Sequence, residues 1–274
     1  MHNETKCALT AEDLKRIDVY SDPQLTPDGS AYAFVSTTAN DDDDYASQLF
    51  FQSLNEQEPR QWTFHDAKNS HPRFSPDGKK VVFQSNRSGI PQLWLLHTDG
   101  GEAKQLTTFK HGAVNPEWSK DGKFIIFSAP LEQDDDVTDQ HEASKDERQK
   151  EQEEKSKQPL VVNRLKYKSD ANGFHDEKRT QIILYDLANE TFDQLTSADT
   201  DHHFEDISPD GQLLVFSANL SEDRDYELTN DLYLLNLSTK NITTLTNGKG
   251  QYGNARFSPS GAKIACFGHE FAYA

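Results

Sequence analysis

The chain has 274 residues, of which 34% are hydrophobic and 10% aromatic, so it can bury a sizeable core in one or two domains. Its 46 acidic and 28 basic residues give a net charge of −18. Such a surface repels phosphate backbones and anionic lipid, which argues against nucleic-acid and membrane partners. The longest apolar runs, such as residues 81–83, are too short to span a bilayer.

The start of the chain and its cysteine content favour a cytoplasmic protein. Residues 1–7 lack the apolar stretch of a secretion signal. Two cysteines, Cys7 and Cys266, are too few for a disulfide framework, as expected in a reducing compartment. We therefore predict a cytoplasmic localisation.

The first 20 residues are predicted to be an amino-terminal segment with one short helix, and residues 21–274 to form the main domain. Thr10 is a helix-capping residue, and Asp13 stands three positions later, the spacing of a capping box. A short capped helix is therefore expected from Thr10 to Arg16.

A hairpin-turn pattern then recurs five times along the chain. Proline presets φ at the first turn position, aspartate can bond the nearby backbone, and glycine accepts a positive φ. The copies are Leu25–Gly29, Phe74–Gly78, Trp118–Gly122, Ile207–Gly211 and Phe257–Gly261. A short apolar strand follows each copy and has a phenylalanine near its end: Phe34, Phe83, Phe127, Phe216 and Phe267. Residues 81–83 and 124–127 are apolar at successive positions, which is typical of a strand buried on both faces.

Further strands follow these turns at a constant spacing. Additional strands are predicted at residues 92–96, 181–185 and 231–235, and each unit ends in a short closing strand with a threonine: Thr63, Thr107, Thr196 and Thr246. Each closing threonine precedes the next turn glycine by 15 residues, from 63 to 78, 107 to 122, 196 to 211 and 246 to 261. Four equal offsets indicate one repeated structural unit.

One of these units carries an insertion. Successive turn glycines are 49, 44, 89 and 50 residues apart. The extra length lies in residues 131–158, which are almost wholly polar and lack aromatic residues. Such a segment cannot bury enough surface to fold by itself. We predict an exposed, charged insertion that is partly helical at most, and favour a solvated loop over a docking element.

The repeat length predicts the fold. A unit of 44 to 50 residues with four short strands has the length of a propeller blade. We therefore predict an all-β fold, a β-propeller of four-stranded blades, with about four and a half blades present. The fifth unit stops near residues 271–274, after its first hairpin, which indicates an incomplete ring. A five-bladed ring closed by the amino-terminal residues is the alternative.

No catalytic or cofactor-binding residue is predicted. The sequence lacks a Gly-x-Ser-x-Gly nucleophile elbow, a His-Glu-x-x-His motif, a paired Cys-x-x-Cys motif and a phosphate-binding glycine motif. The repeated aspartates are interpreted as turn formers, not acid–base catalysts: Asp28, Asp77, Asp121 and Asp210.

Four histidines precede the turn motifs by a few residues: His71, His111, His202 and His203. In a propeller they would lie around one mouth of the channel, where convergent imidazoles could bind a metal. We interpret each instead as bonded to a neighbouring blade, and predict neither a metal site nor a cofactor.

Several segments resemble the propeller of serine peptidases of the prolyl oligopeptidase clan (peptidase family S9), in its acylaminoacyl-peptidase-like branch. The resemblance covers nearly the whole chain, whereas the turn motifs alone are shared with TolB-like propellers. The segments that carry it are Thr10–Arg16, Ser21–Gly29, Asn163–Lys168, Gly173–Phe174, Arg179–Gln181 and Gly268–Glu270.

This resemblance implies a function through another domain. In that family the propeller precedes an α/β-hydrolase domain with the catalytic Ser, Asp and His, and it limits the size of the peptide substrates. A seven-bladed ring would be usual. None of the triad residues has a counterpart here, so the chain is expected to be inactive alone. Its expected partners are the missing α/β-hydrolase domain and the peptide substrates of the parent enzyme.

Two alternatives remain. The first is a TolB-like propeller that acts as a protein-binding scaffold at the channel mouth. The second is an independent propeller enzyme, such as a lyase or phosphatase with a metal in its channel, which would need a closed ring and convergent ligands.

Overall fold

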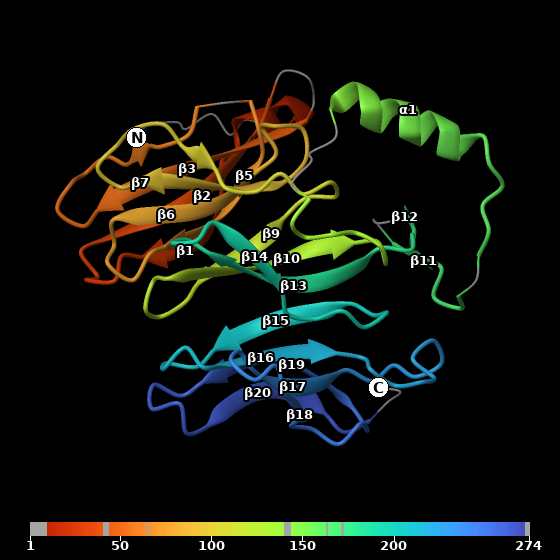
Figure 1. Cartoon of the computed structure of the whole chain (residues 1–274). Helices are drawn as coiled ribbons and strands as arrows, with labels where there is room; N and C mark the ends of the chain where they lie inside the picture. Colours follow the sequence, from red (N-terminus) through yellow and green to blue (C-terminus); the bar gives the residue numbers. More distant parts are fainter. Residues whose placement is uncertain are drawn as a thin grey trace, which may run out of the picture.

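The chain folds as a row of small antiparallel sheets that fan out side by side (Figure 1). The computed structural model describes residues 10–40, 44–64, 66–139, 144–162, 164–170 and 173–271. These residues form four four-stranded sheets, a two-stranded sheet at the carboxyl-terminal end and a small separate hairpin. The predicted all-β propeller architecture is confirmed. Neither helix of the described chain has the length and apolar character that a bilayer crossing requires.

The first two sheets follow the predicted order of strands. The first comprises β1 (Val19–Leu25), β2 (Ala31–Ala39), β3 (Tyr45–Ser53) and β4 (Arg60–Gln61). The second comprises β5 (Asn69–Phe74), β6 (Lys80–Ser85), β7 (Gln92–His97) and β8 (Lys104–Gln105). In each sheet the recurrent turn joins the first two strands, and consecutive strands pair antiparallel.

The third sheet contains the insertion between its second and third strands. It comprises β9 (Val114–Trp118), β10 (Phe124–Leu131), β13 (Arg179–Asp186) and β14 (Thr191–Gln194). Between β10 and β13 the chain forms α1 (Lys145–Ser156) and the hairpin of β11 (Lys168–Ser169) with β12 (Gly173–Phe174). Helix α1 stands apart from the sheets (Figure 1). Leu131 is a buried residue of β10, so the first residue of the predicted insertion belongs to the strand.

The fourth sheet is complete, and the last is a single hairpin. The fourth comprises β15 (His202–Ile207), β16 (Leu213–Ala218), β17 (Asp231–Asn236) and β18 (Ile242–Thr244). The last pairs β19 (Gln251–Phe257) with β20 (Ile264–His269). The final residues of the predicted fifth unit, 272–274, lie outside the described residues.

The recurrent turns are built by the hydrogen bonds that the sequence pattern predicts. In the second sheet, Ser75 Oγ donates to Asp77 Oδ1 at 2.6 Å and accepts from the Lys80 backbone N–H at 3.0 Å. Gly78 adopts φ +68°, which is accessible to glycine at little cost. Asp77 Oδ1 also accepts from the backbone N–H of Lys79 at 3.1 Å, so this oxygen holds both sides of the turn.

The closing threonines bond back to the third strand of their own sheet. Thr107 Oγ1 accepts from the backbone N–H of Leu93 at 2.9 Å and donates to Gln92 Oε1 at 2.7 Å. Thr196 makes the same two bonds, with Ile182 and Gln181. Both threonines are buried, so their hydroxyl groups fasten each short outer strand to the start of the third strand of its sheet.

The core lies between adjacent sheets, not within one of them. The second strands are buried on both faces as predicted: Val81, Val82, Phe83, Ile125, Ile126 and Phe127 are all 0% exposed. Phe83 packs in a cluster shared by the first two sheets, and Phe127 in one shared by the second and third. Burying each such side chain contributes about 1.5–3 kcal/mol, so stacking of neighbouring sheets is the main source of stability.

The amino-terminal segment contains a 3₁₀ helix, η1 (Ala11–Arg16), where a short capped helix was predicted. The backbone N–H of Thr10 donates to the Asp13 carboxylate at 2.8 Å, which completes one half of the expected capping box. Cys7 lies outside the described residues, and Cys266 is exposed.

Candidate functional site

The first strand of each sheet is the inner strand of a propeller blade and carries a bulge. Inner strands of neighbouring sheets lie side by side, β1 with β5, β5 with β9, and β15 with β19. Their pairing with the second strand shifts register halfway along. At four of the bulges a non-glycine residue has a positive φ: Asp22 (47°), His71 (54°), Asn115 (54°) and Asn254 (52°). Bulges of this kind re-aim side chains, here along the inner faces of the blades.

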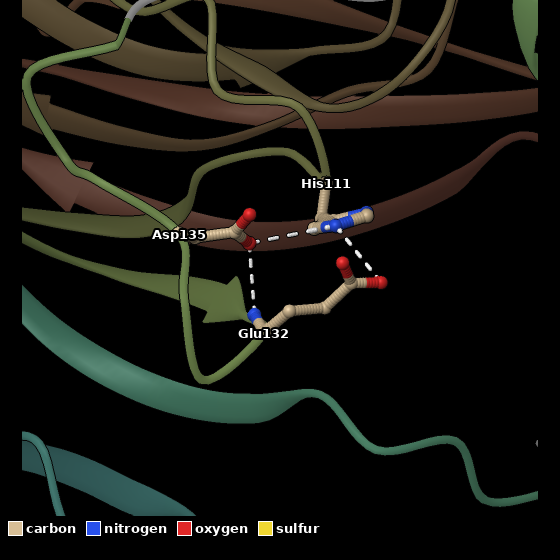
Figure 2. Close-up of side chains that lie close together, drawn as sticks. All are labelled: His111, Glu132 and Asp135. Atoms are coloured by element: carbon tan, nitrogen blue, oxygen red, sulfur yellow. Dashed lines mark hydrogen bonds and ion pairs between the residues drawn. The ribbon is translucent and has the colours of Figure 1, made fainter.

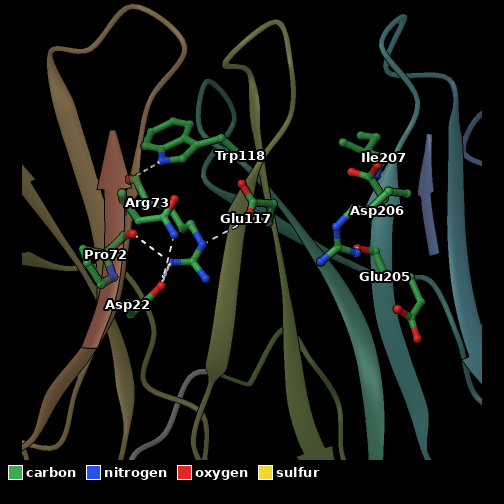
Figure 3. Close-up of polar contacts among 10 residues, drawn as sticks. Asp22, Pro72, Arg73, Glu117, Trp118, Glu205, Asp206 and Ile207 are labelled. Atoms are coloured by element: carbon green, nitrogen blue, oxygen red, sulfur yellow. Dashed lines mark hydrogen bonds and ion pairs between the residues drawn. The ribbon is translucent and has the colours of Figure 1, made fainter. Parts of the chain in front are cut away.

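Arg73 links three blades at this inner face (Figure 3). Its guanidinium donates to both carboxylate oxygens of Asp22 on β1, at 3.0 and 3.1 Å, and to Glu117 Oε2 on β9 at 3.2 Å. The backbone carbonyl of Arg73 in turn accepts from the indole N–H of Trp118 at 2.9 Å. The Arg73 side chain is only 19% exposed, so these bonds are shielded from solvent.

Electrostatic interactions stabilise the contacts of Arg73 with Asp22 and Glu117. Burial raises the pKa of Glu117, and the Arg73 guanidinium opposes that shift. Truncating either partner would leave a partly buried charge without its counter-ion, which is strongly unfavourable. We call Asp22, Arg73 and Glu117 the inner ion-pair network.

A second polar cluster joins the fourth sheet to the last hairpin (Figure 3). Glu205 Oε2 accepts from the backbone N–H of Ala255 at 3.1 Å, and the Arg256 guanidinium donates to the Glu205 carbonyl oxygen. Asp206 Oδ2 accepts from the Phe257 backbone N–H at 2.8 Å. These contacts hold β19 against β15.

Sequence reasoning missed both clusters, although a signal was present. The position five residues before each turn glycine is polar or charged in all five units: Gln24, Arg73, Glu117, Asp206 and Arg256. A polar or charged residue at the same position of every inner strand indicates a polar surface, here that of the inner channel.

The four histidines singled out from the sequence do not converge into one metal site. His71 lies at the bulge of β5 with Nδ1 3.2 Å from Ser70 Oγ, and burial lowers its pKa. His202 is 2% exposed and packs against the Phe216 ring, whereas His203 is exposed. His111 alone among them belongs to a group of three potential ligands within the described residues, with Glu132 and Asp135.

The turn aspartates are structural in the described chain. Hydrogen bonds from turn hydroxyl groups lower the pKa values of three of them, from Ser75 to Asp77, from Ser208 to Asp210, and from Thr26 to Asp28. A carboxylate stabilised in its charged form is a poor general acid.

Comparison with known proteins places this geometry in a family. Residues 15–163 match the family model of the TolB beta propeller domain, and residues 148–273 match that of the acylaminoacyl-peptidase N-terminal beta-propeller domain. A Bacillus subtilis protein described as the uncharacterized peptidase YuxL is 34% identical over 232 residues, which cover 84% of this chain and 34% of that protein.

Solved structures show the same fold at low sequence identity. The Pyrococcus horikoshii acylaminoacyl peptidase superposes with a TM-score of 0.68 at 19% identity, covering 94% of this chain and 37% of that one. TolB from Acinetobacter baumannii superposes with a TM-score of 0.53 at 17% identity, and the match covers 93% of this chain and 48% of that one.

The class of the chain is thus a TolB-type β-propeller, and the chain belongs to that family. Within it, the propeller is of the S9-peptidase type, as the match to the acylaminoacyl-peptidase N-terminal beta-propeller model and the similarity to YuxL show. It spans about a third of the length of the curated peptidase relatives that it matches.

Proposed function

We propose that this chain is the non-catalytic, substrate-gating part of a cytoplasmic serine peptidase that hydrolyses short peptides. The observation that carries the proposal is the inner ion-pair network. It ties three blades together at the face of the propeller that a peptide would pass. Because the Arg73 guanidinium attracts a carboxylate on each neighbouring blade, the network resists separation of the blades and limits the size of what can enter.

The hydrolytic part of the protein is proposed to be an α/β-hydrolase domain outside this chain. Two uncovered apolar faces support a larger assembly. On the first sheet, Val19, Tyr20 and Leu25 are 56%, 64% and 66% exposed, and on the last hairpin Phe267 is 77% exposed. Apolar surface of this extent at both ends of the row of sheets favours contact with further protein.

The first experiment compares two proteins from one gene. The 274-residue chain and the product of the reading frame extended beyond Ala274 are assayed with N-acylated and free short peptide p-nitroanilides. We expect hydrolysis only from the extended product, inhibited by a serine-directed reagent. Inhibitor-sensitive hydrolysis by the 274-residue chain would refute the proposal. If the frame does not extend, a TolB-like binding scaffold becomes the better explanation.

The gating role is tested in the extended protein. Arg73→Met removes the charge that joins Asp22 to Glu117, and should raise kcat/KM for a decapeptide relative to a tripeptide several-fold. Lys104→Met is the matched control, because Lys104 lies on the outer strand β8 and forms an exposed ion pair with Glu190. An unchanged ratio in Arg73→Met, with the fold intact by circular dichroism, would argue against gating by the network.

A further inference from the structure

Three potential metal ligands meet at the point where the insertion leaves the third sheet (Figure 2). His111 lies in the loop between β8 and β9, and Glu132 and Asp135 follow directly after β10. His111 Nε2 is 3.5 Å from Glu132 Oε1 and 3.5 Å from Asp135 Oδ2. In the described residues this is the one group of three or more His, Cys, Asp or Glu side chains with ligand atoms within 4.8 Å of one another.

Rigid elements hold these side chains in place. The loop of His111 is fixed by Gly112, whose φ is +97° and whose position leaves no room for a side chain, since a Cβ would lie 2.8 Å from the Pro91 carbonyl oxygen. On the other side, Leu131 and Val137 flank the two carboxylates and are buried in the core. A site held by packed neighbours loses little entropy on binding an ion.

The imidazole of His111 and the two carboxylates face one another across a short gap. His111 Nε2 is buried and makes no hydrogen bond. Two carboxylate oxygens thus lie 3.5 Å from an imidazole nitrogen that has no hydrogen-bond partner, and these are ligand atoms that divalent cations accept.

The surrounding groups orient the carboxylates. Lys110 Nζ lies 3.2 Å from Glu132 Oε2, the oxygen that faces away from His111, and so directs Oε1 toward the imidazole. The Glu132 backbone N–H donates to Asp135 Oδ2 at 2.8 Å. Such outer contacts orient metal ligands in known sites. Lys178 is itself paired with Asp176, which offsets its repulsion of a bound cation.

We propose that His111, Glu132 and Asp135 bind one divalent metal ion of the Zn²⁺ type. Metal–ligand bonds of about 2.0–2.2 Å in a tetrahedral site place the ligand atoms about 3.3–3.6 Å apart, which matches the two observed separations. One imidazole with two carboxylates suits Zn²⁺ better than Mg²⁺ or Ca²⁺, which prefer oxygen ligands alone. Water completes the coordination.

The bound metal fixes the insertion to the junction of the second and third blades. His111 precedes β9 in the sequence, and Glu132 and Asp135 follow directly after β10. Farther along the insertion, Arg148 of α1 is half-buried and reaches Gly89 in the loop between β6 and β7. The metal therefore anchors the base of a segment whose helix approaches the second blade through one side chain, that of Arg148.

The test measures Zn²⁺ binding to the purified 274-residue chain after chelator treatment, by competition with a chromophoric chelator. We expect one tight equivalent per chain, at least tenfold weaker in His111→Ala, Glu132→Gln and Asp135→Asn. Asp134→Asn and His203→Ala are the matched controls, because both residues are exposed and outside the group. Circular dichroism verifies that each variant folds.

A second readout separates this site from surface histidines that capture Zn²⁺ nonspecifically. Zn²⁺ should slow proteolysis of the insertion near residues 132–137 in the native chain and in the controls, but not in Glu132→Gln. The proposal is overturned if the controls weaken binding as much as the three variants, or if none of the variants weakens it. Tighter binding of Ca²⁺ or Mg²⁺ than of Zn²⁺ would overturn the assignment of the metal type.

Discussion

The fourth sheet and the last hairpin have similar turn sequences, with Asp210 in one and Ser260 in the other, and they differ in what covers them. In the fourth sheet, Phe216 is 0% exposed and stacks on Tyr233 with ring centroids 5.2 Å apart. On the hairpin, Phe267 is 77% exposed. One face of the hairpin is still covered, because Ala255 is 0% exposed against Val215. A second strand is therefore fully buried only where a third strand and the next sheet lie over it.

The register of the two second strands also differs. Phe216 stands five residues after its turn glycine, as do the phenylalanines of the preceding units, but Phe267 stands six residues after Gly261. Cys266 takes the equivalent position and is exposed. Because side chains alternate along a strand, this one-residue offset moves Phe267 to the other face.

The largest expected difference in stability is between alanine substitutions of Phe216 and Phe267. Phe216→Ala removes a fully buried ring and should lower the free energy of unfolding by about 3–5 kcal/mol. Phe267→Ala should change it by less than about 0.5 kcal/mol, since the ring is exposed. Urea unfolding followed by circular dichroism measures both. Equal losses would show that the hairpin face is covered in solution, for example by a second copy of the chain.

The second largest loss of stability is expected from the closing threonine, Thr246, which the fourth sheet has and the described hairpin lacks. Thr246 Oγ1 accepts from the Leu232 backbone N–H at 3.0 Å and donates to the Asp231 carboxylate. Thr246→Val removes both bonds and should cost about 1.5–3 kcal/mol, because one partner is charged and both lie in buried residues. Thr243→Val, at an exposed site on β18, is the control and should be nearly neutral. A similar loss in both variants would contradict the anchoring role.

The turn serines should show a smaller difference. Ser208 is 2% exposed, donates to Asp210 Oδ1 at 2.6 Å and accepts from the Leu213 backbone N–H at 2.9 Å. Ser208→Ala should cost about 1–2 kcal/mol. Ser258→Ala in the hairpin should cost about 0.5 kcal/mol, because Ser258 is less buried and its turn partner is the neutral Ser260. The urea midpoints of the two variants measure these losses, and a larger loss in Ser258→Ala than in Ser208→Ala would refute the prediction.

The smallest effect depends on pH. The Ser208 hydroxyl and the Gln212 backbone N–H lower the pKa of Asp210 below 3.8, so the unfolded chain binds a proton more readily than the folded one. The stability that Asp210 contributes is therefore present above pH 3.8 and lost as the pH falls through its lowered pKa. Asp210→Asn should lower the urea midpoint at pH 7 and not at pH values below that pKa. Ser260→Asp should add the same pH dependence to the hairpin turn, and a pH-independent effect would contradict this assignment.

Much of the fold follows from short segments of sequence. The turn hydrogen bonds of Ser208 and Asp210 lie within residues 207–213, and the closing Thr246 bonds Asp231, a residue 15 positions earlier in its own sheet. The strands were predicted for the same reason, since their apolar runs are local. The short helix was predicted at the observed position, and its 3₁₀ geometry was not.

The polar sites were not predicted, because their members are far apart in the sequence. Arg73 is separated from Asp22 by 51 residues and from Glu117 by 44, and only the stacking of three sheets joins them. The four histidines share a place in the repeat, which suggested a common site. Of these, the described structure groups only His111 with other potential ligands, and those ligands come from the start of the insertion.

The sequence by itself determined the repeating blade, its turns and its doubly buried strands, because those depend on hydrogen bonds and apolar patterns within about 50 residues. Tertiary structure alone decided which charges meet at the inner face, which carboxylates face His111, and which phenylalanine lacks a cover. Those outcomes depend on the angle and register at which one sheet packs on the next, and no local pattern in the chain specifies either.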